Sequence, residues 1–287
     1  MAEPPSRIAT HVAGDGYSWH YRHYASLGSP SQRGTVVCLH GIQSHGGWYE
    51  FSCERMAQAG FDVYFLDRRG AGLNQTARGD TPSFQRLLDD IVEFLIIHRS
   101  SSNGPTFVVG ISWGGKLAAA LPFYRPNLID GLVLICPGFF PKLTSRMRRL
   151  SKFIPLVKLL FPRHRISVPL SDPTLFTSTP RWLEFLRHDR LALHKATARF
   201  LAASLDLDRY LHQVSQNFHL PVLLILAGQD RIIENAPTRE FVEHFATADR
   251  EIIVYPQAHH TLEFEPQPDQ FTADLIAWLM KHSETRP

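Results

Sequence analysis

The chain has 287 residues, of which 44% are hydrophobic and 20% are charged, a composition typical of a globular protein with a substantial core. A net charge of +3, with no basic run interleaved with aromatic residues, argues against a nucleic-acid-binding protein. No uncharged apolar stretch of about 18 residues predicts a transmembrane helix, and Met1 to Ser6 do not form a signal peptide, so we expect a cytoplasmic protein.

Short apolar segments alternate with amphipathic segments along most of the chain. The first two form a predicted β-hairpin, because residues 8–12 and 17–24 flank the turn sequence Gly14-Asp15-Gly16. Further strands are predicted at residues 35–39, 61–66, 106–110, 132–136, 221–227 and 251–255. Helices are predicted at residues 49–59, from Thr81-Pro82 onward with Pro82 at the first helical position, and at 114–124, 236–245 and 271–281.

This alternation predicts an α/β fold with a mostly parallel central sheet and helices on both faces. It is interrupted between residues 139 and 210, which contain proline-punctuated, basic and partly helical sequence without strand–helix alternation. Such a length is too great for a loop inside a compact domain. We therefore expect a helical cap at 139–210, inserted between core parts 1–138 and 211–287, over the carboxyl ends of the strands.

The most informative motif is Gly110-Ile111-Ser112-Trp113-Gly114, between a predicted strand and a predicted helix. In this context, the G-x-S-x-G pattern places a serine hydroxyl on a sharp, strained turn at the edge of a sheet. The glycines at 110 and 114 remove side chains that would collide with the neighbouring strand and helix. We predict that Ser112 is a nucleophile; a phosphate-binding loop is the rival, but no lysine follows at P-loop spacing.

Two later loops carry a candidate acid and a candidate base. Asp230 follows the strand at 221–227, and His259 and His260 follow the strand at 251–255. Both loops open at the carboxyl ends of strands, where Ser112 emerges, and the order Ser, Asp, His is that of the fold with this serine turn. Asp230 would orient an imidazole that takes the serine proton and returns it to the leaving group.

Some alternatives stay open on the residues alone. Either His259 or His260 could be the base, and Asp206 and Asp208 are alternative carboxylates. The cysteines at positions 38, 53 and 136 have no spacing typical of a disulfide framework or a zinc site. We expect no metal and no cofactor.

Acyl transfer also needs fixed N–H donors for the developing oxyanion. In this fold one donor belongs to the residue after the nucleophile, here Trp113, and the other to a loop after an earlier strand. The sequence His40-Gly41-Ile42 lies in such a loop, so we predict the Ile42 N–H as the second donor. We expect His40 and Gly41 to order this loop; a catalytic role for His40 is the alternative.

These motifs resemble those of the α/β-hydrolase superfamily, and within it the monoglyceride lipase and lysophospholipase branch. The resemblance covers nearly the whole chain outside the insertion. It includes an oxyanion loop at 40–49, a turn at 67–72, and a histidine loop at 258–262 that matches best with His260 as the base. The resemblance therefore favours His260 over His259. Ile111, Trp113, Gln43 and Ser44 depart from the branch's usual residues, which leaves the substrate open.

The resemblance implies a serine hydrolase that cleaves carboxylic esters with an apolar acyl chain, such as a monoacylglycerol or a lysophospholipid, through an acyl-enzyme on Ser112. A thioesterase, amidase or acyltransferase with the same triad is the alternative. A further alternative is a catalytically silent binding protein with a hydrolase fold. Haloalkane dehalogenases and epoxide hydrolases resemble this fold but use an aspartate nucleophile, and position 112 is a serine.

The predicted cap contains a basic amphipathic stretch. Between residues 142 and 165 there are eight basic and no acidic residues: Lys142, Arg146, Arg148, Arg149, Lys152, Lys158, Arg163 and Arg165. Interleaved leucine, isoleucine, valine and phenylalanine residues give it an apolar side. Such a stretch can lie on an anionic lipid surface; the alternative is a solvated helix that packs on the core. Trp182, Phe185 and Phe200 are candidates to line an acyl pocket.

Overall fold

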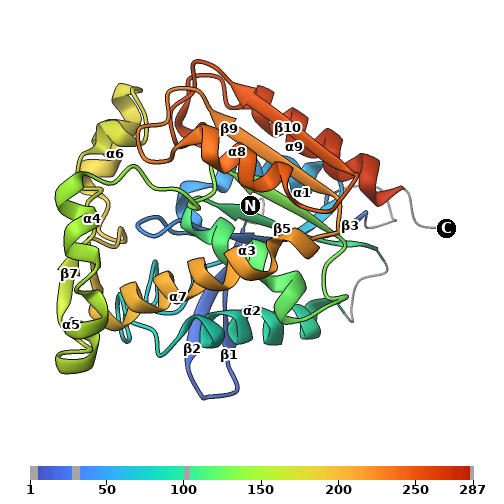
Figure 1. Cartoon of the computed structure of the whole chain (residues 1–287). Helices are drawn as coiled ribbons and strands as arrows, with labels where there is room; N and C mark the ends of the chain where they lie inside the picture. Colours follow the sequence, from blue (N-terminus) through green and yellow to red (C-terminus); the bar gives the residue numbers. More distant parts are fainter. Residues whose placement is uncertain (1–5, 28–32, 100–103, 285–287) are drawn as a thin grey trace.

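The computed structural model describes residues 6–27, 33–99 and 104–284. At its centre is an eight-stranded sheet in the order β1-β2-β4-β3-β5-β6-β9-β10 (Figure 1). Strands β1 and β2 are antiparallel, and the six from β4 to β10 in this order are parallel. The strands are β1 (Arg7–Val12), β2 (Ser18–Tyr24), β3 (Gly34–Leu39), β4 (Phe61–Leu66), β5 (Thr106–Ile111), β6 (Gly131–Ile135), β9 (Val222–Ala227) and β10 (Arg250–Tyr255).

Helices cover both faces of this sheet, and each face has its own apolar cluster. On one face, α1 (Glu50–Gln58) and α9 (Asp269–Ser283) pack over alternate strand residues such as Val36 and Cys38. The residues between them, such as Val37 and Leu39, face a second cluster. That cluster is covered by α2 (Phe84–Arg99), α3 (Trp113–Tyr124), α7 (Ala198–Val214) and α8 (Asn235–Glu243). Continuous burial on both sides explains why the central strands are uninterrupted apolar runs.

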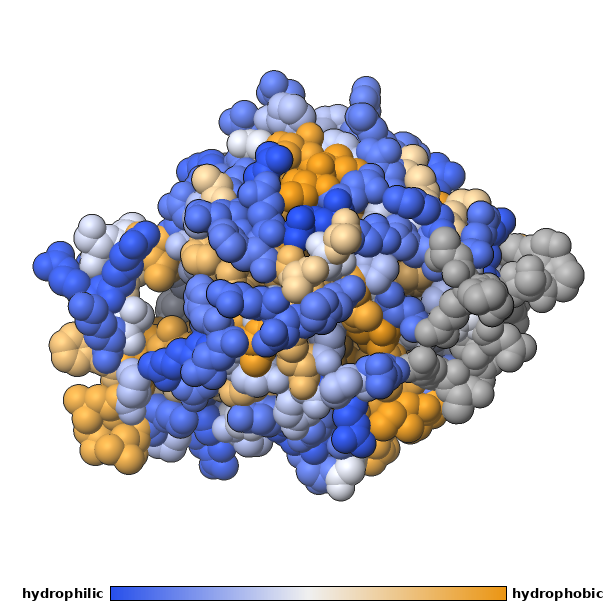
Figure 2. All heavy atoms as spheres, turned by 45° about the vertical axis from the view of Figure 1, so that its right-hand side comes forward, coloured by the Kyte–Doolittle hydropathy of each residue, from blue (hydrophilic) through white to orange (hydrophobic). Residues whose placement is uncertain are grey.

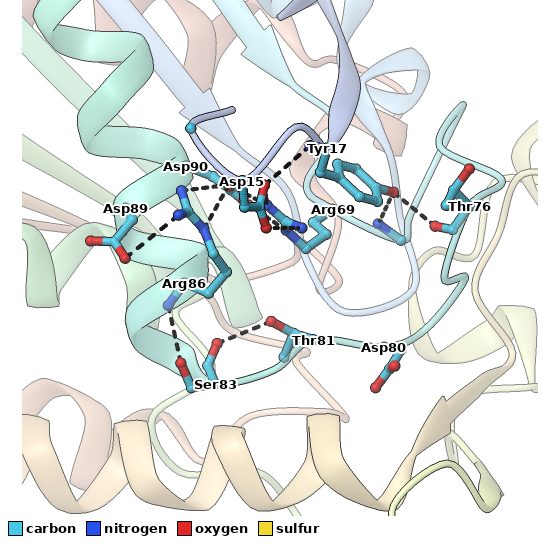
Figure 3. A network of polar contacts seen from close by, with 12 residues as sticks. Asp15, Tyr17, Arg69, Thr76, Asp80, Thr81, Ser83, Arg86, Asp89 and Asp90 are labelled. Atoms are coloured by element: carbon cyan, nitrogen blue, oxygen red, sulfur yellow. Dashed lines mark hydrogen bonds and ion pairs between the residues drawn. The ribbon is translucent and has the colours of Figure 1, made fainter. Parts of the chain in front are cut away.

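Helix α2 begins later than the sequence analysis predicts. Its first residue is Phe84, so Pro82 is not in the first helical position. Ser83 Oγ instead accepts a hydrogen bond from the Arg86 N–H, and the Thr81 hydroxyl binds the Ser83 carbonyl (Figure 3). A serine that satisfies a free N–H of the first turn is a preferred helix start, and the sequence analysis overlooked it in favour of Pro82.

The segment between β6 and β9 contains short elements at the carboxyl side of the sheet, at the left of Figure 1. They are α4 (Ser145–Ser151), α5 (Ile154–Leu160), β7 (Arg165–Ser167), α6 (Pro180–His188) and β8 (Lys195–Thr197). Strands β7 and β8 form an antiparallel pair, which the sequence analysis did not predict because each has only three residues. The expected boundary at 210 falls inside α7, which packs against α2 and α3 on the sheet.

Backbone hydrogen bonds join this segment to three loops at the carboxyl edge. The Leu193 N–H donates to the Gln43 carbonyl at 2.8 Å, and the Thr197 N–H to the Gly79 carbonyl at 2.9 Å. The Thr261 N–H donates to the carbonyl of residue 176 at 3.0 Å. The segment between β6 and β9 therefore contacts the loops after β3, β4 and β10. Within the described ranges, no helix combines the length and apolar character needed to cross a membrane.

Candidate active site

Ser112 lies at the sharp turn between β5 and α3, in a strained backbone conformation with φ 51° and ψ −123°. The two motif glycines allow this turn. A Cβ on Gly110 would lie 2.6 Å from the Ala118 Cβ, and one on Gly114 only 2.3 Å from the Leu39 carbonyl oxygen. The turn can therefore approach β3 and α3 closely only because both positions lack side chains.

Ser112, His260 and Asp230 form one hydrogen-bonded chain across three strand ends. His260 Nε2 lies 2.9 Å from Ser112 Oγ, and His260 Nδ1 lies 2.7 Å from Asp230 Oδ2. All three residues are buried, with 9%, 3% and 3% of their surfaces exposed, respectively. Because Nδ1 faces a carboxylate it carries the ring proton, so Nε2 is free to accept the serine proton.

Asp230 is held in its charged form. Its Oδ1 atom accepts hydrogen bonds from the N–H groups of Ile232 and Ile233, at 2.7 and 2.9 Å. Burial acts to raise the pKa of Asp230, but the charge and hydrogen bond of His260, together with these two N–H groups, hold that pKa below its usual value. An ionised carboxylate in this position orients and stabilises an imidazolium.

The alternative site residues have other partners. The His259 N–H and Nδ1 both contact Glu265 Oε1, at 2.8 and 3.0 Å, so this side chain is tied to its own loop. Asp206 pairs with Arg209 on α7. Asp208 lies 2.7 Å from Lys116 Nζ. The hydrogen-bonded chain to Ser112 includes neither His259 nor these two carboxylates.

The predicted oxyanion donors are Trp113, which follows Ser112 in the chain, and Ile42, which follows Gly41. Trp113 is the first residue of α3, and an N–H in that position has no intrahelical acceptor. Ile42 belongs to the loop that follows β3. The neighbouring Gly41 is close to the nucleophile, since a Cβ built on it would be 3.2 Å from the Ser112 Cβ. A bulkier residue at 41 would crowd the serine.

His40 is buried in the same loop, and its ring contacts backbone groups of Gly41 and Arg68 as well as the Arg68 guanidinium. Its Nδ1 atom lies 2.8 Å from the Gly41 carbonyl, and its Nε2 accepts from the Arg68 N–H at 3.0 Å. Burial and the nearby Arg68 charge hold the pKa of His40 well below its usual value. The Arg68 guanidinium contacts the carbonyls of Gly41 and Ile42 in this loop. The sequence analysis missed this contact because it gave no role to the side chains of the 67–72 turn.

Aromatic residues of the inserted segment lie against these loops. Trp182 stacks on Phe264, four residues after His260, with ring centroids 4.4 Å apart. Phe200 packs against Trp113 at 5.1 Å. Phe176, which the sequence analysis did not single out, contacts the His260 ring edge-on at 6.1 Å. One aromatic ring of this segment, that of Phe176, therefore touches the hydrogen-bonded chain directly, and the other two pack on residues of the adjoining loops.

One group of potential metal ligands lies within the described residues, and it overlaps this site. Ligand atoms of Cys136, Asp230 and His260 lie within 4.8 Å of one another. Two ligands of a tetrahedral ion, each about 2.0 Å from it, lie about 3.3 Å apart, whereas the Asp230 and His260 atoms are 2.7 Å apart. Burial and the Asp230 charge also raise the pKa of the Cys136 thiol, which disfavours the thiolate that a metal needs. The distance between Asp230 and His260 is that of a hydrogen bond, and these residues do not fit a bound metal ion.

Comparison with known proteins identifies the family. The family model described as serine aminopeptidase, S33, matches residues 30–267. The chain belongs to this family. It is therefore a hydrolase, and its eight-stranded sheet confirms the predicted α/β-hydrolase fold.

Individual relatives extend over most of the chain. A monoacylglycerol lipase of Mycolicibacterium smegmatis is 27% identical over 258 residues, or 87% of this chain and 89% of that protein. An uncharacterised abhydrolase domain-containing protein of Dictyostelium discoideum is 27% identical over 252 residues, but the match covers only 26% of its length. The crystal structure of Paleococcus ferrophilus monoacylglycerol lipase has a TM-score of 0.81 at 25% identity and covers 92% of this chain and 99% of that chain. These matches confirm the resemblance to monoglyceride lipases.

Proposed function

We propose that this hydrolase cleaves carboxylic esters with an apolar acyl chain, with Ser112 as nucleophile, His260 as base and Asp230 as orienting acid. The observation that carries the proposal is the chain of hydrogen bonds from Ser112 Oγ through the His260 ring to Asp230, at 2.9 and 2.7 Å. Each atom in this chain has the donor or acceptor role that acyl transfer requires.

The reaction follows from this geometry. As Ser112 Oγ bonds to the ester carbon, its proton moves to His260 Nε2 and the carbonyl electron pair moves to the oxygen. The N–H groups of Ile42 and Trp113 hold that oxyanion. When the tetrahedral intermediate collapses, the alkoxide leaves with the His260 proton. Water then gives a proton to His260 and attacks the acyl-enzyme. As this second tetrahedral intermediate collapses, His260 passes that proton to Ser112 Oγ and the acid is released.

Similarity and the surroundings of the site support the substrate class. The Mycolicibacterium smegmatis relative and the Paleococcus ferrophilus structure are both named monoacylglycerol lipases. The Phe176 ring packs against His260 and the Phe200 ring against Trp113, so the neighbourhood of the triad is apolar. We therefore favour a monoacylglycerol- or lysophospholipid-like ester. The family description names an aminopeptidase, so an amide is the second candidate substrate.

Two measurements test this function. A fluorophosphonate probe should label the wild-type chain and should not label Ser112→Ala. A panel of p-nitrophenyl esters, monoacylglycerols and matching amides should show turnover that rises with acyl length and is highest for esters. Labelling of Ser112→Ala would rule out the proposed nucleophile, and faster cleavage of the amides would rule out the ester preference.

We also propose that residues 139–210 act as a cap between the core parts 1–138 and 211–287, and that the cap contacts anionic lipid. Large apolar residues in and after α4 and α5 are exposed: Leu150, Phe153, Leu156, Leu159, Leu160 and Phe161. Figure 2 has an apolar group at its lower left edge, where Figure 1 places α5, beside strongly hydrophilic side chains. Exposed apolar groups among eight basic residues match an anionic bilayer surface.

Flotation with vesicles tests the lipid contact. The wild-type chain should float with phosphatidylglycerol vesicles and much less with phosphatidylcholine vesicles. Combined serine substitutions at 156, 159 and 160 should abolish flotation, whereas Ile8→Ser with Val12→Ser, which removes exposed apolar residues of β1, should not. Absence of wild-type flotation with both lipids would refute the contact and leave the proposed hydrolysis untouched.

A further inference from the structure

Arg68 has a buried guanidinium that binds the proposed oxyanion loop. Only 9% of the residue is exposed. Its Nη1 donates to the Gly41 carbonyl at 2.7 Å and its Nη2 to the Ile42 carbonyl at 2.6 Å, while its backbone N–H donates to His40. One residue after β4 thus makes three hydrogen bonds to three consecutive residues after β3.

This guanidinium is buried at a cost in free energy. Burial lowers the pKa of Arg68 to about 9, against the opposing charge of Asp67. Among the ion pairs of the described residues, none involves Arg68. The group is held instead by the two carbonyls and by the rings of Trp113 and Phe200, whose centroids lie 5.0 and 5.3 Å away. Stability alone gives little reason to bury such a charge.

The carbonyl that Arg68 binds belongs to the same peptide unit as the proposed donor. In a planar trans peptide, the Gly41 C=O and the Ile42 N–H point in opposite directions, and the described residues contain no cis peptide bond. With the carbonyl bound to Arg68, the N–H must face away from the guanidinium. Gly41 itself faces Ser112, because its Cβ position would be 3.5 Å from Ser112 Oγ.

The neighbouring Arg69 joins the same turn to α2 and to the β1–β2 hairpin. Its guanidinium binds Asp90 through Nε and Nη2, at 2.9 and 2.7 Å, and also pairs with Asp15. The ring of Tyr17 lies 4.2 Å from it, and the Tyr17 hydroxyl accepts from the Gly70 N–H. Figure 3 shows this network of the turn, the β1–β2 hairpin and α2. Arg68 therefore projects from a well-anchored backbone.

We propose that Arg68 is a positioning residue of the oxyanion hole, which sets the Gly41–Ile42 peptide plane and packs against Trp113, the other donor. This inference rests on the proposed function. By holding the carbonyl with a positive group, Arg68 also polarises the peptide and strengthens its N–H as a donor. This stabilisation acts when the substrate carbonyl oxygen gains charge and is small in the bound ester. Arg68 should therefore affect kcat more than KM.

Kinetics of matched variants in the full chain test this role. In Arg68→Met, kcat for a p-nitrophenyl ester should fall about 10- to 100-fold, because an oxyanion donor is misplaced and not removed. KM should change less than about threefold, because the contact with the oxyanion forms during the reaction and not in the bound ester. Affinity for a trifluoromethyl ketone, which forms an oxyanion on Ser112, should fall in parallel with kcat. Arg68→Lys keeps the charge but not the fork and should lie between. Arg250→Met is the matched control, because the Arg250 guanidinium also binds backbone carbonyls, those of Val242, Phe245 and Thr247, at the start of β10 and away from the histidine loop. This variant should lower the melting temperature and leave kcat within about threefold of wild type.

The outcomes separate this role from a structural one. A folded Arg68→Met with wild-type kcat, or a fall in kcat without loss of ketone affinity, overturns the proposal. An equal fall of kcat in Arg250→Met also overturns it, since a general loss of stability would then explain both. If Arg68→Met does not accumulate as folded protein, Arg68→Lys tests the role instead. Wild-type kcat and wild-type ketone affinity in Arg68→Lys would then overturn the proposal. Full activity of Ser112→Ala would instead refute the proposed function itself.

Discussion

The carboxylate of Glu263, three residues after His260, accepts a hydrogen bond from the Ser52 N–H at 3.0 Å. Ser52 lies in the first turn of α1, whose preceding residue provides no side-chain cap. Glu263 therefore caps from the histidine loop a helix that follows the oxyanion loop. It is 4% exposed, and its Oε2 has no hydrogen-bond partner among the described residues.

The burial of Glu263 should make stability depend on pH. Burial raises its pKa to about 7, with the Glu50 charge adding to the shift and the N–H groups of α1 opposing it. Between its ordinary pKa of 4.5 and about 7, the folded chain binds a proton that the unfolded chain has released. The free energy of unfolding therefore falls as pH rises through this window, by about 3 kcal/mol at most.

Glu263→Gln should remove this part of the pH dependence. Urea unfolding at pH 5 and pH 8 should show a smaller loss of stability in the variant than in the wild-type chain. Glu243→Gln, which changes an exposed carboxylate on α8, is the matched control and should behave as wild type. An identical pH dependence in all three proteins would mean that Glu263 does not titrate in this window.

Substitution of the two adjacent histidines should have unequal effects on ester turnover. His260→Ala removes the group between Ser112 and Asp230 and should lower kcat/KM by about 10³ or more. His259→Ala breaks only the contact with Glu265 and should stay within about tenfold of wild type. Initial rates with a p-nitrophenyl ester give the comparison. The reverse order would reassign the base to His259.

The carboxylate of Asp230 should matter more for turnover than for folding. Asp230→Asn can still accept from the N–H groups of Ile232 and Ile233 but loses the charge next to His260, so kcat should fall by about 10³. Asp206→Asn changes a half-buried carboxylate on α7 that pairs with Arg209 and Lys158 and serves as the control. Ester kinetics and thermal unfolding of both variants provide the readout. Comparable kcat values would contradict the assignment of Asp230.

Gly114→Ala should strongly destabilise the chain. The added Cβ would lie 2.3 and 2.6 Å from the carbonyl oxygens of Leu39 and His40, and backbone atoms cannot move aside without displacing β3 or α3. We expect a loss of about 3 kcal/mol or more. Gly14→Ala is the control, because its Cβ would meet only the end of the Glu93 side chain at 3.3 Å. Equal melting temperatures for the two variants would contradict the close approach at Gly114.

The features that the sequence predicted well are local in origin. Each central strand is buried on both faces, so its sequence is a continuous apolar run. The helices between the strands have apolar residues at helical spacing. The serine turn could be recognised because its glycines and its strand–helix context are contiguous. The start of α2 was predicted wrongly because two helix-start signals lie next to each other. Pro82 suggested the first helical position, but Ser83 caps the helix.

Tertiary structure alone decided how distant side chains meet. Residue type and position after β10 do not separate the two adjacent histidines, and only the family resemblance favoured His260. In the structure one ring lies 2.9 Å from Ser112 and the other binds Glu265. Arg68 lies in a motif that looks purely structural, and its bonds to Gly41 and Ile42 depend on two loops being adjacent at one sheet edge. Residue order therefore determined the elements and the types of groups available. The sheet's register and the direction of each side chain decided which groups are close enough to react, because proton transfer and hydrogen bonding require contact distances.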